Sequence, residues 1–542
     1  MTPENLIDIQ SQLTARKALV DGYQQTVLEY ATPYGVQSGS GQMKDITTHP
    51  GRYGVLSDAV KTLAAGLYSN TLRVGEQWYA LQHPDAEVRK DETVNDIYSR
   101  ATVVTQQMLY SSNIAEAIQP VLRYYAAVGC GCLYTYETDR GIAFKPYSPR
   151  DICVEDSPDG DPAIVSRETL LTNAQAIQYF NREGDQIPDS IITEQAEPTS
   201  RYRTHKYLHI VMENPEYIPG SRLKGHLEYI GYWICRDFAD RIIRTEDLDY
   251  MPYAVPRQAV EDQYPYGYGQ GTEALADAQL YNRAMDDMLD SIETAAHPPI
   301  FLPAGLSRED IDLRPRAVNT GLNPGEVPFV LSTGGDLNAL SAVISETRST
   351  IQDKCFVNFF NALRSVPAGM TATEVLERQD EKLQQILPIV SGLMSGLYRP
   401  IVRNTVIAAL NAGRIPGEEV LRTPDGLDIE YSSRLVSKLK DLETAHMLEV
   451  AQITGTLEQA AATRTGAVVI DPVKWLRRIA RNKGLDPDLI PAEQDIQANA
   501  ELYDEAQAEA SQQAAIMSSL APADPNKAPQ PGSPLDVARR GI

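Results

Sequence analysis

Side chains that could carry out chemistry are sparse in this 542-residue chain. His205 and His209 are the only two of the seven histidines that lie close together, and their spacing suits alternate positions on a strand. The favoured interpretation is a surface pair with satisfied hydrogen bonds rather than a metal site. Four carboxylates also cluster around Pro158, but their spacing differs from that of a calcium-binding loop: Glu155, Asp156, Asp159 and Asp161.

The cysteines are few, at Cys130, Cys132, Cys153, Cys235 and Cys355. Their odd number and low density are typical of a reducing compartment without a disulfide framework. Cys130 and Cys132 are too close together for a zinc knuckle, and no second pair follows them. All five are therefore predicted to be structural thiols.

Known catalytic motifs are missing from the sequence. It has no Gly-x-x-x-x-Gly-Lys-Ser/Thr phosphate loop, no His-Glu-x-x-His zinc motif and no Gly-x-Ser-x-Gly nucleophile elbow. Residues 267–271 are rich in glycine, but they lack the Gly-x-Gly-x-x-Gly spacing and follow a Tyr/Pro loop rather than a clear strand. The sequence predicts a protein that is not an enzyme and that needs no cofactor and no metal.

The charge of the chain limits its classes of partner. Lys and Arg number 49 against 73 Asp and Glu, a net charge of −24, and such a surface repels phosphate backbones. Tight general DNA binding is not expected, because isolated nucleic-acid-binding domains usually have a basic surplus. No run of 18 apolar residues and no signal-peptide pattern is found, so no membrane segment is expected. The excess of 28 tyrosines over 8 phenylalanines fits subunit interfaces and half-buried core positions equally well.

Hydrophobic periodicity predicts an α+β fold that is mainly helical. Four N-terminal helices are expected, at residues 5–29, 55–71, 94–111 and 113–128. Alternation with a period of two then predicts antiparallel strands, with a short helix among them at 173–180. The strands are expected at 133–136, 143–146, 207–212, 227–235 and 241–244.

The C-terminal half is predicted to be mostly helical as well. Single helices are expected over 272–296 and 336–363, with an irregular segment of short strands between them. The capping box at Thr371-Ala372-Thr373-Glu374 opens a helix that reaches residue 412 and that kinks at Pro388 and Pro400. Further elements are a strand at 427–431, helices at 437–463 and 473–482, and a disordered tail from residue 520.

The helix expected over 272–296 has two opposite faces. One is an apolar stripe, made of Tyr281, Met285, Met288 and Ile292. The other is a carboxylate stripe, made of Asp286, Asp290 and Glu293. In an isolated subunit this is a solvated face opposite a packing face, whereas in a ring of subunits the carboxylates line a tunnel. The sequence leaves both interpretations open.

The order of several motifs resembles the head-to-tail connector, or portal, family of short-tailed double-stranded DNA phages. Tyr266-Gly267-Tyr268-Gly269-Gln270-Gly271 precedes the long helix, and His297-Pro298-Pro299-Ile300 follows it. Later come Met370-Thr371-Ala372-Thr373-Glu374-Val375 with Arg378 and Glu381-Lys382, and then Leu427-Asp428-Ile429-Glu430-Tyr431. Segments 57–69, 78–81 and 471–487 agree too, so the resemblance covers about residues 10 to 500.

The resemblance implies a portal-type fold assembled as a ring, usually of twelve copies, at one capsid vertex. It assigns the wing to 1–270 and 371–436, the stem helices to 271–297 and 336–363, the clip to 298–335, the channel loop to 364–370, the crown to 437–519 and a tail to 520–542. The implied partners are other copies of the chain, major capsid and scaffolding proteins, the terminase packaging motor, tail adaptor proteins and double-stranded DNA in the channel, with no membrane. The protein is then a virion component made in the host bacterial cytoplasm.

Three groups of residues receive expected roles from this resemblance. Asp286, Asp290 and Glu293 line the channel. A loop that projects into the channel contains Arg364, Ser365, Val366, Pro367, Ala368, Gly369 and Met370. A basic cluster either pairs with neighbouring subunits or contacts the last packaged DNA: Lys474, Arg477, Arg478, Arg481 and Lys483. The alternatives are an acidic collar or internal core protein without a channel, and a hydrolase that uses paired carboxylates.

Overall fold

The computed structural model describes residues 1–32, 51–72, 77–85, 88–138, 141–221, 223–260, 264–298, 300–302, 312, 314–320, 329–330, 337–364, 384–415, 421 and 427–431. Its contacts divide the chain into two units, Met1–Ser433 and Arg434–Ile542, and every described residue belongs to the first. The expected crown, the tail, the basic cluster and residues 365–370 of the expected channel loop lie outside the described residues.

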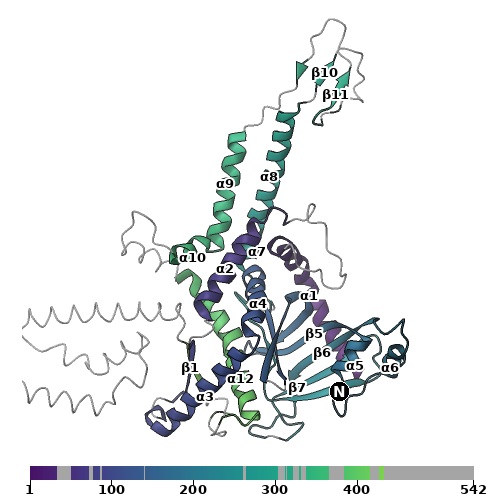
Figure 1. Ribbon diagram of the computed structural model, residues 1–542, viewed down its shortest axis with the longest axis vertical. Coiled ribbons are helices and arrows are strands. Elements are labelled where there is room, and N and C mark those ends of the chain that lie inside the picture. The colour runs from purple at the N-terminus through teal and green to yellow at the C-terminus, as the bar shows by residue number, and fades with distance from the viewer. Residues whose placement is uncertain are drawn as a thin grey trace, which may run out of the picture. The chain divides into compact units, whose positions relative to one another are not determined.

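The described part combines helices with mostly antiparallel strands, which confirms the α+β prediction (Figure 1). The four N-terminal helices are α1 (Pro3–Ala31), α2 (Val55–Thr71), α3 (Glu92–Ser111) and α4 (Ile114–Val128). A hairpin of β2 (Cys132–Thr138) and β3 (Gly141–Tyr147) follows, and β9 (Tyr253–Ala254) pairs with β2 to make a three-stranded sheet. No helix in the described part is both long enough and apolar enough to cross a bilayer.

The main sheet has five antiparallel strands in the order β4-β5-β6-β7-β8. They are β4 (Ile152–Asp156), β5 (Pro162–Thr172), β6 (Thr204–Glu213), β7 (Tyr229–Cys235) and β8 (Ile242–Leu248), with α5 (Asn173–Tyr179) and α6 (Asp189–Ala196) between β5 and β6. Leu208 and Ile210 lie on one face of the sheet with Leu6 of α1. Tyr207 and Trp233 lie on the other face under Phe180. Successive side chains of β6 thus point to opposite faces of the sheet, and both faces are covered, so most of this central strand is buried.

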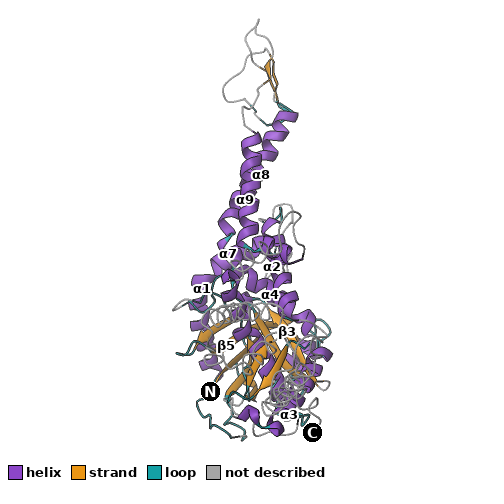
Figure 2. Cartoon of the chain, turned by 90° about the vertical axis from the view of Figure 1, so that its left-hand side faces the viewer, coloured by secondary structure: helices purple, strands orange, loops and turns teal. Residues whose placement is uncertain are grey.

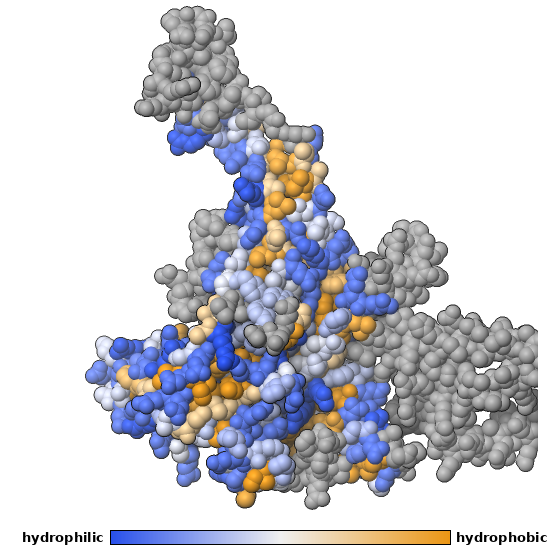
Figure 3. Space-filling model, turned by 180° about the vertical axis from the view of Figure 1, so that it is seen from behind, coloured by the Kyte–Doolittle hydropathy of each residue, from blue (hydrophilic) through white to orange (hydrophobic). Residues whose placement is uncertain are grey.

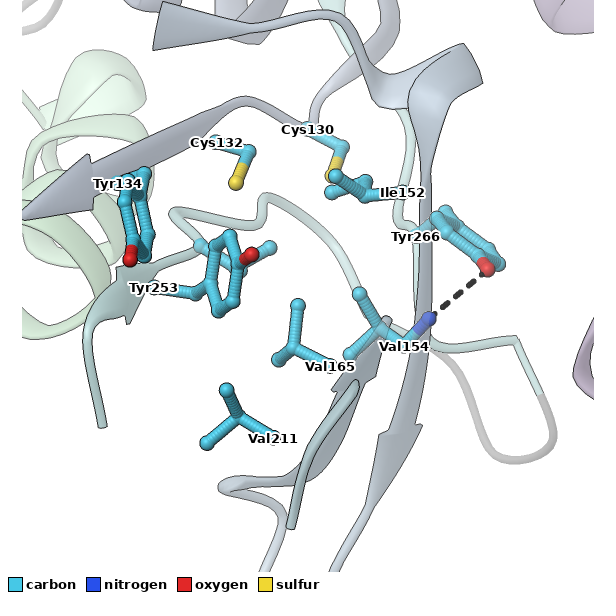
Figure 4. Packing of buried hydrophobic residues seen from close by; sticks show 10 residues of the cluster. Cys130, Cys132, Tyr134, Ile152, Val154, Val165, Val211, Tyr253 and Tyr266 are labelled. Atoms are coloured by element: carbon cyan, nitrogen blue, oxygen red, sulfur yellow. Dashed lines mark hydrogen bonds between the residues drawn. The ribbon is translucent and has the colours of Figure 1, made fainter. Parts of the chain in front are cut away.

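A third core cluster joins the two sheets (Figure 4). It contains Cys130, Cys132, Val165 and Val211, together with Tyr134 and Tyr253. All five cysteines are buried and free, which confirms the prediction of structural thiols. Several tyrosines are also core residues: Tyr79, Tyr98, Tyr125, Tyr207, Tyr253 and Tyr398 are among the largest fully buried side chains.

The expected strand at 427–431 is observed as β13 (Asp428–Tyr431). It pairs antiparallel with β1 (Tyr79–Gln82), with Tyr79 opposite Tyr431. Trp78 stacks on Tyr431 and makes an edge contact with Tyr398. The pairing therefore ties a segment near residue 80 to one near residue 430.

The two long helices predicted over 272–296 and 336–363 are each broken. The first becomes α7 (Gln270–Glu273) and α8 (Leu275–Ala296), which separate at Ala274. The second becomes α9 (Leu337–Lys354) and α10 (Val357–Arg364), because Phe356 adopts a left-handed φ of 54°. That turn lets Phe359 and Phe360 become buried where α10 contacts α2. Tertiary packing therefore overrides a continuous helical pattern.

The helix that contains Pro388 and Pro400 was expected to kink at both prolines, but its irregularity is of another kind. Residues 384–393 are helical, Met394–Tyr398 form a π-helical turn, and α12 (Arg399–Asn411) follows, with Pro400 in its first turn. The π turn changes the backbone hydrogen-bond pattern directly before Pro400, which has no N–H of its own to donate. The irregularity is thus a π turn before Pro400, and Pro388 lies inside the helical stretch.

Gly66 of α2 offers a direct test of the contact between α2 and α10. A Cβ at this position would lie 2.4 Å from the ring of Phe360. We expect Gly66→Ala to lower the free energy of unfolding by about 1–3 kcal/mol, because the core must shift to admit the methyl group. Gly22→Ala is the matched control, since its Cβ meets nothing within 4 Å. That control should stabilise α1 by about 0.5–1 kcal/mol. Equal effects in urea titrations of both variants would contradict the packing.

Candidate functional site on helices α8 and α9

Helices α8 and α9 lie side by side, and both views show the pair running from α7 and α10 toward a small sheet (Figures 1 and 2). That sheet contains β10 (Ile300–Leu302), β11 (Val318–Thr320) and β12 (Phe329–Val330), which confirms the short strands expected between the helices. At the other end, Lys354 donates to Asp277 Oδ2 at 2.5 Å and to the Glu273 carbonyl at 3.2 Å. This cation joins the start of α8 to the end of α9.

The three predicted channel carboxylates share one face of α8 by helical spacing, but they are not equivalent. Asp286 accepts hydrogen bonds from Arg52 Nη2 at 2.6 and 2.5 Å and from the Tyr53 hydroxyl at 2.5 Å. These two donors lower the pKa of Asp286, Tyr53 first and Arg52 second. Asp290 and Glu293 are exposed. The exposed charge on this face therefore belongs mainly to Asp290 and Glu293.

The apolar stripe of α8 is a packing face over only part of its length. Tyr281 is buried, Met285 and Met288 are half-buried, and Ile292 is 42% exposed. Leu289 beside it is 49% exposed, and α9 adds exposed apolar residues at Leu337 and Val343. Figure 3 shows the resulting apolar band along the helix pair. The helical periodicity of the sequence predicts this apolar stripe, but it does not show which part of the stripe is buried by other residues of the same subunit.

Arg364 was predicted to begin a loop, but it is the last residue of α10. The residues that sequence analysis missed are Arg52 and Tyr53, which lie more than 230 positions before Asp286. Their local context gives no signal for this contact. An arginine next to a tyrosine in a polar segment occurs in many structural environments, so the local sequence does not indicate the contact with Asp286.

His205 and His209 do occupy alternate positions on β6, but the surface location predicted for them is wrong. His205 is 4% exposed, between Glu194 Oε2 at 2.7 Å and Asp237 Oδ2 at 3.1 Å. His209 is fully buried, with its Nδ1 2.5 Å from the Tyr253 hydroxyl and its ring stacked on Trp233. No group of three or more possible metal ligands occurs in the part of the chain that the structure describes.

The pair of His209 and Glu246 should make stability depend on pH. Burial lowers the pKa of His209 to about 4, although Glu246 lies 3.5 Å away and partly opposes this. Burial acts to raise the pKa of Glu246, but His209 and Arg244 outweigh it and lower the value to about 2. Both pKa values lie below those that the same groups have in the unfolded chain, so the folded state loses stability as the pH falls. His209 contributes to this loss below about pH 6.5, and Glu246 contributes below about pH 4.5.

We expect His209 to account for a loss of about 2 kcal/mol in the free energy of unfolding between pH 7 and pH 5. Denaturant titrations at the two pH values measure this loss. The variant His209→Gln has no titrating ring, so its stability should change less over the same interval. An equal decrease in both proteins would show that other groups cause the pH dependence.

The glycine-rich segment at 267–271 has a packing role in this structure. A Cβ on Gly271 would lie 2.6 Å from the Ala127 carbonyl oxygen, and one on Gly269 would lie 2.4 Å from the Gly129 nitrogen. The backbone thus passes directly over the end of α4. This close approach explains the glycines without a phosphate ligand.

Comparisons with known proteins support the family that the order of the sequence motifs indicates. The family model for the bacteriophage head to tail connecting protein matches residues 4–490. A probable portal protein of Bordetella phage BPP-1 is 22% identical over 471 residues, which cover 85% of this chain and 83% of that protein. The family match extends over well more than half of the chain, from α1 past β13. The chain therefore belongs to the bacteriophage head-to-tail connecting protein family.

Proposed function

We propose that the protein is a phage portal: a ring, of twelve copies, that connects the head to the tail and through which DNA is packaged, retained and ejected. The observation that carries this proposal is the family match over residues 4–490. The similarity to a probable portal protein of a Bordetella phage supports it. The family connects two parts of a virion, so the role is structural rather than enzymatic.

We propose that α8 and α9 form the stem and that β10, β11 and β12 belong to the clip. The wing is then formed by the helices and strands before α7 together with α12 and β13. The residues after 436 form the crown and the tail. The exposed leucine and isoleucine side chains on α8 support this division. Exposed apolar patches of this kind mark protein–protein contacts, and neighbouring stems in a ring would cover them.

Asp290 and Glu293, with Asp286 nearer the wing, are proposed to line the channel. Exposed carboxylates repel DNA phosphates, so a passing duplex is not held. The loop 364–370, beginning at the end of α10, is proposed to touch the DNA in the channel. The basic cluster at 474–483 is proposed to pair with neighbouring subunits or to contact the last packaged DNA.

The proposed partners follow from the position between head and tail. They are other copies of the chain, major capsid and scaffolding proteins, the terminase packaging motor, tail adaptor proteins and the double-stranded DNA itself. We place the protein at the portal vertex of the virion, after synthesis in the host bacterial cytoplasm.

Electron microscopy of the purified protein tests the proposal. Closed rings with an open centre are expected, alone or with scaffolding protein, because each subunit presents two different surfaces to its neighbours. A monodisperse monomer at high concentration, with no rings under either condition, would contradict the proposal. Solid particles without a central opening would instead favour a collar or internal core protein.

A further inference from the structure

Helix α9 carries opposite charges on its two flanks. The helix packs along α8, and its buried residues are Thr347 and Ile351. At about 100° per residue, Arg348 lies about 80° to one side of this buried stripe, whereas Glu346 lies about 120° to the other side. The two residues differ by only about 3 Å along the helix axis. A cation and an anion thus lie at nearly the same height on different flanks.

Neither of these two charges has a partner within the described part of the subunit. Arg348 and Glu346 are both exposed, and no ion pair or side-chain hydrogen bond joins either of them to another described residue. None of the residues three or four positions away from them along α9 is charged, so the helix itself offers no ion pair. Lys354 on the same helix, by contrast, pairs with Asp277 at 2.5 Å.

Arg348 lies at an open pocket of about 200 Å³ between α2, α8, α9 and the start of α10. Gln352 and Tyr281 line the same pocket. Tyr281 is only 8% exposed, and its hydroxyl has no hydrogen-bond partner among the described residues. Asp58 is the one carboxylate in the lining, and Lys61 lies 3.5 Å from it. Three hydrogen-bond donors around a pocket of this size suit the carboxylate of an entering side chain.

The pocket also shows which flank of the helix pair Arg348 shares. Tyr281 belongs to the apolar stripe of α8, so the stripe and Arg348 open on the same flank, and Ile292 continues the stripe farther along α8. Figure 3 shows apolar residues along the helix pair. The other flank of α9 carries Glu346 together with Val343, which is 40% exposed. The helix pair therefore has two unlike flanks, as a ring built from heterologous contacts requires.

We propose that the Glu346 carboxylate of one copy enters the pocket of the neighbouring copy and pairs there with Arg348. The inference rests on the proposed ring. Rotation about the channel axis leaves the height of every residue unchanged, so helices that run along the channel bring Glu346 of one copy to within about 3 Å of the height of Arg348 in the next. Apolar burial is not directional, whereas this ion pair fixes the height at which neighbouring stems meet.

Exchange of the two charges tests the pair. Arg348→Glu and Glu346→Arg each place like charges together and should each raise the protein concentration for half-assembly about tenfold. The double variant with both substitutions restores an opposite pair at every contact, so its half-assembly concentration should return to within about threefold of the original. Arg201→Glu, at an exposed turn before β6, is the control and should change the value less than about twofold. A double variant that assembles no better than the single variants would overturn the proposal.

Chemical crosslinking measures the proximity directly. The five native cysteines are buried, so Arg348→Cys combined with Glu346→Cys supplies the reactive thiols. A short bismaleimide should convert rings of this variant into a ladder of covalent oligomers, whereas unassembled subunits and either single variant should give no ladder. Links within one chain leave its size on a denaturing gel unchanged, so the ladder reports only links between copies. Rings that give no ladder would overturn this inference alone, whereas failure of the unaltered protein to form rings would contradict the proposed function.

Discussion

Replacing both Asp290 and Glu293 with lysine is expected to leave ring assembly intact and to stop DNA passage. Both residues are exposed on the same face of α8, so the subunit can fold with either charge. In the proposed channel, each substitution exchanges a charge that repels phosphates for one that binds them and releases counterions. Repeated around the ring, these contacts should hold the duplex and lower the yield of infectious particles by about 100-fold or more.

The control for this experiment is the neutral pair Asp290→Asn and Glu293→Gln, which keeps side-chain size and adds no cation. We expect packaging close to normal in that variant, measured as DNA-filled heads and as plaque titre. Normal packaging and ejection in the lysine variant would show that the face points away from the DNA. Failure of the lysine variant to form rings would show that the face packs against another subunit.

Asp286 does not belong in this experiment, although the sequence groups it with the other two. A lysine there would face Arg52, which now pairs with the Asp286 carboxylate. The substitution would remove one ion pair and create a repulsion in the same step. Its effect on folding would then obscure any effect on DNA.

The double variant Leu289→Asp and Ile292→Asp is expected to weaken ring assembly strongly while the subunit stays folded. These side chains are 49% and 42% exposed in the subunit, so their replacement removes little of its own core. In the ring their burial contributes about 1.5–2 kcal/mol each. Losing both should raise the protein concentration needed for assembly by about 100- to 1,000-fold.

Sedimentation velocity over a range of concentrations measures this shift, and thermal unfolding of the subunit checks its fold. Val103→Asp is the matched control, because Val103 is 63% exposed but lies on α3 rather than on the helix pair. Rings that form equally well from the double variant and the control would show that α8 is not part of the subunit interface.

Much of the local structure could be predicted because its determinants are close together in the sequence. The helix Val55–Thr71 was predicted with its observed ends, since its apolar residues repeat with the period of one helix face. The strands β6 and β7 were predicted from the alternation of their apolar and polar residues. The order of motifs along the whole chain also indicated the family that the comparisons show.

The errors in the prediction have long-range causes. Phe356 ends α9 because Phe359 and Phe360 are needed beside α2, almost 300 residues earlier in the chain. His209 looked like a surface residue of a strand until the second sheet placed Tyr253 against it. In each case the local pattern allowed two structures, and the burial of distant side chains selected one.

The sequence by itself determined the periodic helices and strands, the absence of familiar catalytic motifs and the carboxylate stripe of α8, because each depends on the type and spacing of nearby residues. Only the tertiary structure decided which of those carboxylates is neutralised and that β1 pairs with β13. These features depend on contacts between segments separated by up to about 350 residues. Such contacts leave no periodic trace in the sequence, since their energy comes from burial and charge pairing that exist only after the chain has folded.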